Sequence, residues 1–295
     1  MLRKRRLWFS LALTLTFLGL FLYRIDLSEA KRALNEARYI FIAPAVLVYF
    51  LGAWFRSLRW RLLVTPLATV SSFRLFPLVL IGFAINNIMP ARLGLVARAY
   101  LLGRREGVSK IASGTTIAVD QMFDGLALLF SIVIISFFVT LPPWARQVAW
   151  LMAFVLGGVL SAFLLMARSR RLTLDLAGWL LGPLPPSWRV RVSDWLGLAL
   201  SGLETLRSPG VLITVFGISL LVWAAEMGAY YITSLSFGLG LPYHVVFLVG
   251  SIANWGIWLG TPGGIGPFEY FGLQALLVFG VADVPARVYI GFLHL

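Results

Sequence analysis

Apolar runs long enough to cross a bilayer recur along the whole of this sequence. The 295-residue chain is 60% hydrophobic and only 13% charged, whereas soluble domains carry about 25% charged residues. Runs of about 18 or more apolar residues are typical of transmembrane helices. The alternating strands of an outer-membrane barrel, about ten residues each, are not seen in the sequence. We therefore predict an all-α polytopic membrane protein whose single transmembrane domain covers residues 1–295.

Interruptions between the apolar runs predict the order of the elements. Two apolar segments, residues 73–90 and 241–281, contain helix-breaking prolines and glycines, and we expect each to enter the membrane and return as a re-entrant hairpin. The more polar segment 168–207 is expected to form helices at the cytoplasmic interface. The residues up to Leu295 resemble the start of another helix, so we predict about six to seven transmembrane helices plus two hairpins. The uninterrupted spans are expected at residues 7–23, 39–58, 108–139, 148–166 and 211–237.

Basic residues indicate the orientation of the chain. The formal net charge of +13 comes largely from arginines at the ends of apolar runs, where they set topology; we therefore expect no nucleic-acid partner. The opening M-L-R-K-R-R precedes an apolar run without a small-residue cleavage site, which predicts an uncleaved first helix and a cytoplasmic N-terminus in the cell (inner) membrane. If residues 73–90 turn back, 19 of the 25 Lys and Arg residues lie inside. The second hairpin then starts from the outer face, oppositely oriented to the first.

The two interrupted segments share a short pattern. The first reads G-F-A-I-N and then P-A-R-L-G, at residues 82–86 and 90–94, and the second reads G-S-I-A-N and then P-G-G-I-G, at residues 250–254 and 262–266. This favours an inverted repeat; the alternative is chance, because Gly and Pro are common in membrane helices. Broken helices at matching places in two halves indicate a transporter binding site. The residues expected to form the hairpin tips and gate the path are Pro90, Gly94, Pro262, Gly263, Gly264 and Gly266.

Polar residues beside the two breaks are the candidate substrate-binding residues. We expect Arg92 to bind a lipid phosphate or carboxylate through paired hydrogen bonds, and Arg98 to do the same or to anchor the chain at the interface. Glu269 lies one turn into the returning half-helix, where it either caps the helix or balances a buried cation. We expect Arg92 and Glu269 to approach a shared central cavity. Asparagines that would cap half-helices or contact a headgroup are Asn86, Asn87 and Asn254.

Three acidic residues lie inside the predicted spans. Asp120 and Asp124 are four residues apart and share one helix face, so we expect salt bridges to Arg92 or Arg98. Glu226 needs a buried partner or a shifted proton affinity, which leaves proton coupling open. We interpret Arg56 and Arg59 instead as cytoplasmic anchors. The tryptophans, such as Trp8, Trp60 and Trp144, look like interface belts.

The sequence gives no sign of a cofactor or metal. There are no cysteines and only two histidines, and neither a further acid nor a histidine has suitable spacing near the Asp120–Asp124 pair. No G-x-x-x-x-G-K-[ST] motif is present. We therefore expect no cofactor, no metal and no catalytic residues, and an energy source in the lipid gradient, the membrane potential or protons.

Together these motifs resemble the lysylphosphatidylglycerol synthase transmembrane-region family of flippase-like membrane proteins. The family's early element is similar to N-I-M-P-A-R-L-G-L-V-A-R at residues 87–98, and its late P-G-G-x-G-x-x-E element is similar to residues 262–269. The D-Q-M-F-D stretch at residues 120–124 is similar to a third element. Leu95 stands where the family often has Glu, and nothing here resembles the family's soluble aminoacyl-transferring domain. The resemblance implies translocation of a phospholipid or lipid-linked headgroup between leaflets.

Two other functions stay open. The chain could be an integral-membrane transferase acting on lipid-linked substrates, although its acids form no D-x-D pattern near the outer face. It could also be a non-transporting partner of a lipid-modifying synthase or a glycosyltransferase. A scaffold of that kind would need the fold but not Arg92 or Glu269 specifically.

Overall fold

The computed structural model describes the backbone of residues 2–23, 25–89, 92–139, 143–181, 185–259 and 261–294, without the side chains of residues 2–7, 9–10, 144–145 and 258. Helices and connecting turns make up these ranges, and no strand occurs among them. The prediction of an all-α fold is therefore confirmed.

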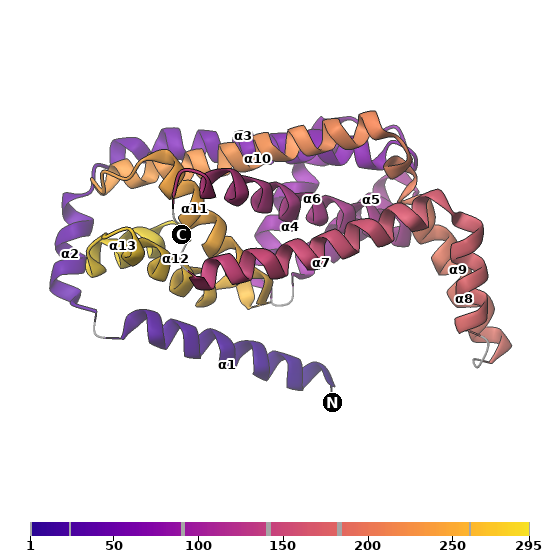
Figure 1. Ribbon diagram of the computed structural model, residues 1–295, viewed down its shortest axis with the longest axis horizontal. Helices are drawn as coiled ribbons and strands as arrows, with labels where there is room; N and C mark the ends of the chain where they lie inside the picture. Colours follow the sequence, from indigo (N-terminus) through magenta and orange to yellow (C-terminus); the bar gives the residue numbers. More distant parts are fainter. Residues whose placement is uncertain are drawn as a thin grey trace.

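Two long helices run side by side along the molecule (Figure 1). They are α3 (Ile42–Val64), which the 3₁₀ helix η1 (Tyr39–Phe41) precedes, and α10 (Pro209–Ser236). Gly52 lets them approach closely, because a Cβ at this position would lie 3.5 Å from both the Ala225 Cβ and the Val222 carbonyl oxygen.

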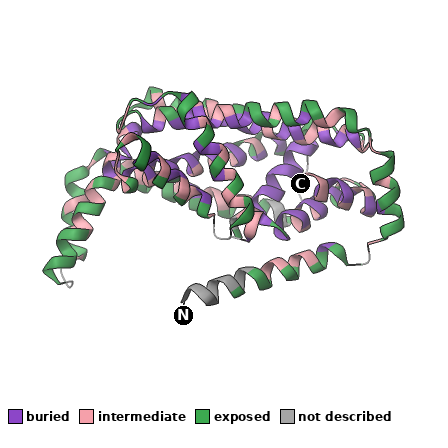
Figure 2. Ribbon diagram, turned by 180° about the vertical axis from the view of Figure 1, so that it is seen from behind, coloured by how far each residue is buried: buried purple, intermediate pink, exposed green. Residues whose placement is uncertain are grey.

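Two more long helices follow, of which α6 (Lys110–Ser136) packs against this pair and α7 (Pro143–Arg168) packs against α6. The start of α6 is fixed by the Ser109 hydroxyl, which accepts a hydrogen bond from the Ala112 N–H at 3.4 Å. Figure 2 shows that exposed residues follow the outer sides of the long helices while buried residues face inward. Many of the exposed side chains are large and apolar, which suits a lipid environment.

The described part of the chain contains fewer long apolar helices than the sequence suggests. Among the described residues, four helices are long and apolar enough to cross a membrane, or five if the pair Leu11–Leu22 and Leu27–Glu36, bent by 83°, counts as one broken span. The expectation of six to seven is therefore not met by length and composition. The last helix, α13 (Asp283–Phe292), has ten residues, about 15 Å of a hydrocarbon core about 30 Å thick.

The first interrupted segment forms a helix pair, α4 (Ser72–Ile88) and α5 (Leu93–Glu106). Arg92 begins α5 in the left-handed conformation with φ 55°, and it is the one non-glycine residue with positive φ in the described backbone. The Asn86 side-chain oxygen accepts a hydrogen bond from the Gly94 N–H at 2.8 Å and so ties α4 to the start of α5. Pro90, one of the predicted tip residues, lies outside the described residues.

The second interrupted segment forms a similar pair, α11 (Tyr243–Gly256) and α12 (Pro267–Val278). Its tip contains the short 3₁₀ helices η3 (Ile257–Leu259) and η4 (Pro262–Gly264), and Gly263, Gly264 and Gly266 have φ values of 59°, 84° and 95°. These conformations suit glycine because it lacks a Cβ.

The two tips share a backbone feature and meet inside the molecule. In the predicted repeat Arg92 aligns with Gly264, and both have positive φ. A Cβ at Gly263 would lie 3.3 Å from the Asn87 carbonyl oxygen, so the second tip packs directly on the end of α4. The breaks therefore lie together although about 170 residues separate them in the chain.

The remaining helices are α1 (Leu2–Leu22), which runs along one side of the long bundle, and shorter helices at its two ends (Figure 1). At one end α1 leads into α2 (Leu27–Glu36), which contacts α13. At the other end α8 (Arg170–Leu180) and α9 (Pro186–Ser201) form a hairpin, and the 3₁₀ helix η2 (Glu204–Arg207) leads on to α10. This arrangement makes α3 and α10 antiparallel.

The two larger parts of the apolar core share α6 and α10. One part contains α4 and α5 with Val119 of α6 and Val215 of α10, and the other contains α11 and α12 with Ala127 and Met227 of the same two helices. Each part surrounds one broken pair. The stretches of α6 and α10 between the two parts carry polar residues, and these form the candidate site.

Candidate functional site

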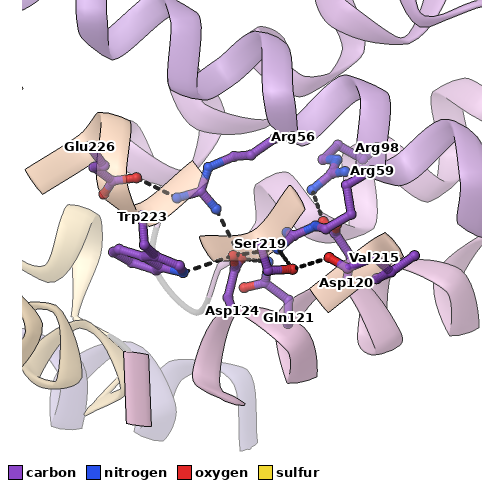
Figure 3. Close-up of polar contacts among 10 residues, drawn as sticks. All are labelled: Arg56, Arg59, Arg98, Asp120, Gln121, Asp124, Val215, Ser219, Trp223 and Glu226. Atoms are coloured by element: carbon purple, nitrogen blue, oxygen red, sulfur yellow. Dashed lines mark hydrogen bonds and ion pairs between the residues drawn. The ribbon is translucent and has the colours of Figure 1, made fainter. Parts of the chain in front are cut away.

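A buried ion-pair network joins α3, α5, α6 and α10 where the two core parts meet (Figure 3). Three arginines and three acidic residues take part, so the charges within the network balance. The members are Arg56, Arg59, Arg98, Asp120, Asp124 and Glu226. Buried charges are stable only when they are paired and hydrogen-bonded.

Asp124 accepts the largest number of hydrogen bonds in the network. Its carboxylate accepts from Arg56 Nη1 at 2.9 Å and from Arg59 Nη1 at 2.9 Å. It also accepts from Trp223 Nε1 and from Gln121 Nε2, both at 3.2 Å. One carboxylate of α6 thus holds α3 and α10 together.

Asp120 lies one turn earlier on α6 and binds two arginines from different helices. It accepts from Arg59 Nε at 2.7 Å and from Arg98 Nη1 at 3.2 Å. The Arg98 guanidinium also stacks 4.2 Å from the centre of the Trp60 ring. Asp120 and Trp60 therefore fix the Arg98 side chain, while Nε and Nη2 of Arg98 are buried and have no hydrogen-bond partner in the described part of the chain.

Glu226 completes the network from α10. One of its carboxylate oxygens accepts a hydrogen bond from Arg56 Nη2. Because Arg56 also donates to Asp124, its guanidinium bridges the acidic residues of α6 and α10. Glu226 was predicted to need a buried partner, and Arg56 is that partner.

The interpretation of Arg56 and Arg59 as cytoplasmic anchors is wrong. Their exposed fractions are 7% and 0%, and their ion pairs turn them into the bundle rather than toward a membrane surface. Trp60 is also buried, with Nε1 donating to the Thr116 hydroxyl at 3.2 Å, so it is no interface tryptophan. The physical reason is that Asp120 and Asp124 of α6 compensate the charges of these arginines inside the bundle. Trp8 is exposed, and the side chain of Trp144 is not among those that the structure describes.

A polar cavity of about 140 Å³ lies against the network. Arg56 and Arg98 line it from the network side, Arg92 lines it from the first tip, and Gly263 and Gly264 line it from the second. Five of the six predicted substrate-binding residues line this cavity, namely Arg92, Arg98, Asn86, Asn87 and Asn254. Three arginines (Arg56, Arg92 and Arg98) and two acidic residues (Asp124 and Glu226) line the cavity, and this formal excess of positive charge favours an anion.

A second, mainly apolar cavity of about 500 Å³ adjoins the first. Apolar side chains of α3 and α13, among them Val46 and Phe292, line it together with Phe268 of α12. The two cavities share part of their lining, which consists of Tyr49, Asn87, Glu226, Asn254, Ile257 and Gly263.

Glu269 does not line either cavity but supports the second tip. It is buried and accepts hydrogen bonds from the Gly266 N–H at 2.6 Å and from His294 Nδ1 at 2.5 Å. His294 Nε2 lies 2.8 Å from the Gly263 carbonyl oxygen, and His294 lines the apolar cavity. Glu269 therefore caps α12, and it reaches the cavity region only through His294.

The His294 contacts predict a pH-dependent contribution to stability. His294 lies beyond α13, outside the candidate spans; burial lowers its pKa, but the hydrogen bond and charge of Glu269 and the Gly263 carbonyl outweigh burial and raise it. Only imidazolium donates from both nitrogens. The contribution of His294 to stability is thus complete below its pKa in the unfolded chain, about 6.5. It is lost as pH rises through the higher pKa of the folded protein.

We expect the melting temperature of the wild type to exceed that of His294→Ala by a few degrees at mildly acidic pH. The gap should narrow as pH rises, and thermal unfolding in detergent across a pH series would measure it. His244→Ala, at an exposed position, is the control for removing a histidine. A gap that widens with pH would contradict the assignment.

Sequence reasoning missed residues that complete the network. Ser219 accepts from Arg59 Nη1 at 2.9 Å, and Trp223 and Gln121 donate to Asp124. The spacing of Arg56 and Arg59 on one helix face, matched with the four-residue spacing of the two aspartates, was the available signal for the pairing. For a metal, the described residues contain no group of three or more His, Cys, Asp or Glu side chains that could hold an ion.

The long apolar helices, the two broken pairs and the internal ion-pair network define a polytopic integral membrane protein. The chain belongs to the family described as the lysylphosphatidylglycerol synthase TM region, which matches residues 7–295. The resemblance stated from the motifs is thereby confirmed.

Three curated proteins illustrate the similarity. A UPF0104 membrane protein of Methanothermobacter thermautotrophicus is 27% identical over 82% of this chain and 76% of its own length. A UPF0104 membrane protein of Methanocaldococcus jannaschii is 29% identical over 39% of this chain and 35% of its own. Glycosyltransferase AglD of Haloferax volcanii is 28% identical over 40% of this chain and only 19% of its own. No solved structure matches the chain.

Proposed function

We propose that this protein is a lipid translocase that moves a phospholipid or lipid-linked anion between the two leaflets of the cell membrane. The observation that carries the proposal is the pair of adjoining cavities, which share six lining residues. One has three arginines and two acidic residues in its wall, and the other is mainly apolar. A ligand with an anionic headgroup and an apolar tail is complementary to both.

Arg98 is the best candidate for the group that binds the headgroup. Asp120 and Trp60 hold its guanidinium, and the Nε and Nη2 donors lie on the same edge of the planar group. That edge binds two oxygens of a phosphate through parallel hydrogen bonds. Arg92 and Arg56 line the same cavity and would add positive charge around the anion.

The two broken pairs are proposed to act as re-entrant hairpins that gate the path. Non-helical backbone at membrane depth persists only where protein or a water-filled cavity satisfies it, and both tips border the polar cavity. Since α4 follows the end of α3, and α11 follows the end of the antiparallel α10, the hairpins enter from opposite ends. This arrangement supports an inverted repeat with the binding site between its halves.

Charge distribution supports a cytoplasmic N-terminus, because the start of α1 points from the α2 end toward the basic end of the bundle (Figure 1). The end of the bundle with the α8–α9 hairpin also carries Arg61, Arg104 and Arg105, all exposed. Basic residues remain in excess at this end even when the buried Arg56, Arg59 and Arg98 are not counted. The opposite end, with α2, has acidic and basic residues interspersed.

An assay in proteoliposomes tests the proposal. The vesicles contain a fluorescent phosphatidylglycerol, and dithionite added outside destroys the fluorophore in the outer leaflet. Wild-type protein is expected to allow quenching well beyond the outer-leaflet half. Arg98→Lys should slow translocation about tenfold or more, because a lysine keeps the charge but loses the paired donors to the phosphate.

Arg104→Lys is the matched control, since Arg104 is exposed on the same helix, and it should translocate at the wild-type rate. Wild-type quenching equal to that of empty liposomes, with phosphatidylglycerol and with other anionic lipids, would contradict translocation. Equal rates for wild type and Arg98→Lys would remove Arg98 from the binding site.

A second candidate function is the membrane-embedded partner of a transferase that acts on lipid-linked substrates. The similarity to part of glycosyltransferase AglD favours it. In that case the cavities would present the lipid to an enzyme, and lipid would bind without crossing. Lipid binding by the wild type together with absent quenching would select this function.

A further inference from the structure

The α8–α9 hairpin projects from the basic end of the bundle and runs across the direction of α3 and α10 (Figure 1). Its base is fixed, because Leu200 of α9 is buried in the core and α9 contacts α6. Most other residues of the hairpin are exposed (Figure 2). If α3 and α10 span the membrane, the hairpin lies along the membrane surface.

One face of α8 is apolar although it is exposed. Leu172, Leu176, Trp179 and Leu180 follow helical spacing, and their exposed fractions range from 61% to 77%. Another sector of the same helix carries Arg171 and Asp175, so the exposed surface is amphipathic. Nothing in the described part of the bundle covers the apolar face.

The second helix of the hairpin, α9, also carries exposed tryptophans and arginines. Trp188 and Trp195 are seven residues apart and lie on one side of the helix. The Arg191 guanidinium lies 5.9 Å from the centre of the Trp188 ring. Tryptophan is enriched at the membrane–water interface, where its ring contacts acyl chains and its N–H meets the headgroups.

The charge of the segment selects the surface that it contacts. Residues 168–207 contain six arginines and three acidic residues, and the neighbouring Arg104 and Arg105 are exposed. Basic residues next to exposed Trp and Leu are typical of helices that lie on anionic leaflets, where each cation gains from the surface potential. A soluble protein surface would not explain tryptophans and leucines spread over two helices of one projecting hairpin.

We propose that the α8–α9 hairpin is an interfacial anchor that inserts its Trp- and Leu-rich face into an anionic phospholipid leaflet. Its arginines bind lipid phosphates while the apolar side chains enter the acyl boundary. The hairpin thereby fixes the basic end of the bundle at the membrane surface. This inference does not depend on translocation, because it concerns a surface outside the two cavities.

Site-directed spin labelling tests the proposal on the full-length protein, which contains no cysteine. Leu176→Cys places a nitroxide on the apolar face of α8. Gly178→Cys places one on the polar side of the same helix, about 200° around it, where an added Cβ meets nothing within 4 Å. Both variants are reconstituted in nanodiscs of phosphatidylcholine alone and with a one-third share of phosphatidylglycerol.

In the anionic discs we expect the label at residue 176 to collide more with oxygen and several-fold less with an aqueous nickel chelate than the label at residue 178. The difference should shrink in phosphatidylcholine discs and in high salt, which screens surface charge. A label at residue 176 that stays open to the nickel chelate in both discs overturns the proposal. Insertion that is equal in both discs overturns the role of charge. Shielding from both collision partners would indicate a protein contact and would also overturn it.

Discussion

Replacing Asp124 by alanine is expected to lower the free energy of unfolding by about 3–5 kcal/mol, because it leaves two buried arginines without their shared carboxylate. Arg56 and Arg59 each donate to Asp124 at 2.9 Å, and Trp223 donates at 3.2 Å. Arg59 is fully buried, and its Nη2 has no hydrogen-bond partner among the described residues. The loss would therefore weaken the attachment of α6 to both α3 and α10.

Thermal or denaturant unfolding of purified protein in detergent measures this effect, and Asp124→Asn separates charge from shape. The asparagine variant retains a hydrogen-bond acceptor, so its loss should be smaller but in the same direction. Asp175→Ala is the control, because its pair with Arg171 is exposed and 3.9 Å long; such pairs contribute about 0–1 kcal/mol. Wild-type stability of Asp124→Ala would mean that the network does not hold the helices together.

Replacing Gly94 by alanine is expected to destabilise the first broken pair by about 1–3 kcal/mol or more. A Cβ at this position would lie 1.9 Å from the Gly82 carbonyl oxygen and 2.5 Å from the Asn86 side-chain oxygen. The Gly82 carbonyl is part of the backbone and cannot move away as the end of a flexible side chain can, so α4 and α5 would have to separate. The same shift would break the hydrogen bond from the Gly94 N–H to Asn86.

Gly158→Ala is the matched control for this variant. Gly158 lies within α7, and an added Cβ there meets nothing within 4 Å. Alanine at a helical position of this kind is expected to stabilise by up to about 1 kcal/mol. If Gly94→Ala and Gly158→Ala unfold at the same temperature, the close contact between α4 and α5 does not form in solution.

The two results also bear on transport. Asp124→Ala removes the support of Arg56 and Arg59, whereas Arg98→Lys changes the proposed headgroup donor and leaves Asp120 paired with Arg59. We expect Asp124→Ala to unfold at a lower temperature, and Arg98→Lys to fold normally but fail to translocate lipid. These two results together would show that the residues that hold the helices together differ from the residue that binds the headgroup.

Several features followed from the sequence because they depend on local chemistry. Long apolar runs predict helices in a membrane, since backbone groups in lipid must pair within the helix. The glycines and prolines at residues 262–266 predicted a break in the chain, and positive φ values occur there at Gly263, Gly264 and Gly266. The grouping of Arg92, Asn86 and Asn254 beside the breaks was also readable, because each belongs to the repeated pattern.

Only the tertiary structure decided which charges pair. Arg56 and Arg59 end an apolar run as topology-setting arginines do, and residues 56–59 look the same whether they face a membrane surface or a buried carboxylate. Their burial depends on Asp120 and Asp124, which lie more than 60 residues away on α6. Glu269 shows the same limit, because its partner His294 becomes a neighbour only when α13 packs against α12. The sequence determines which segments are helices and where they break, whereas long-range packing determines which buried charges compensate one another.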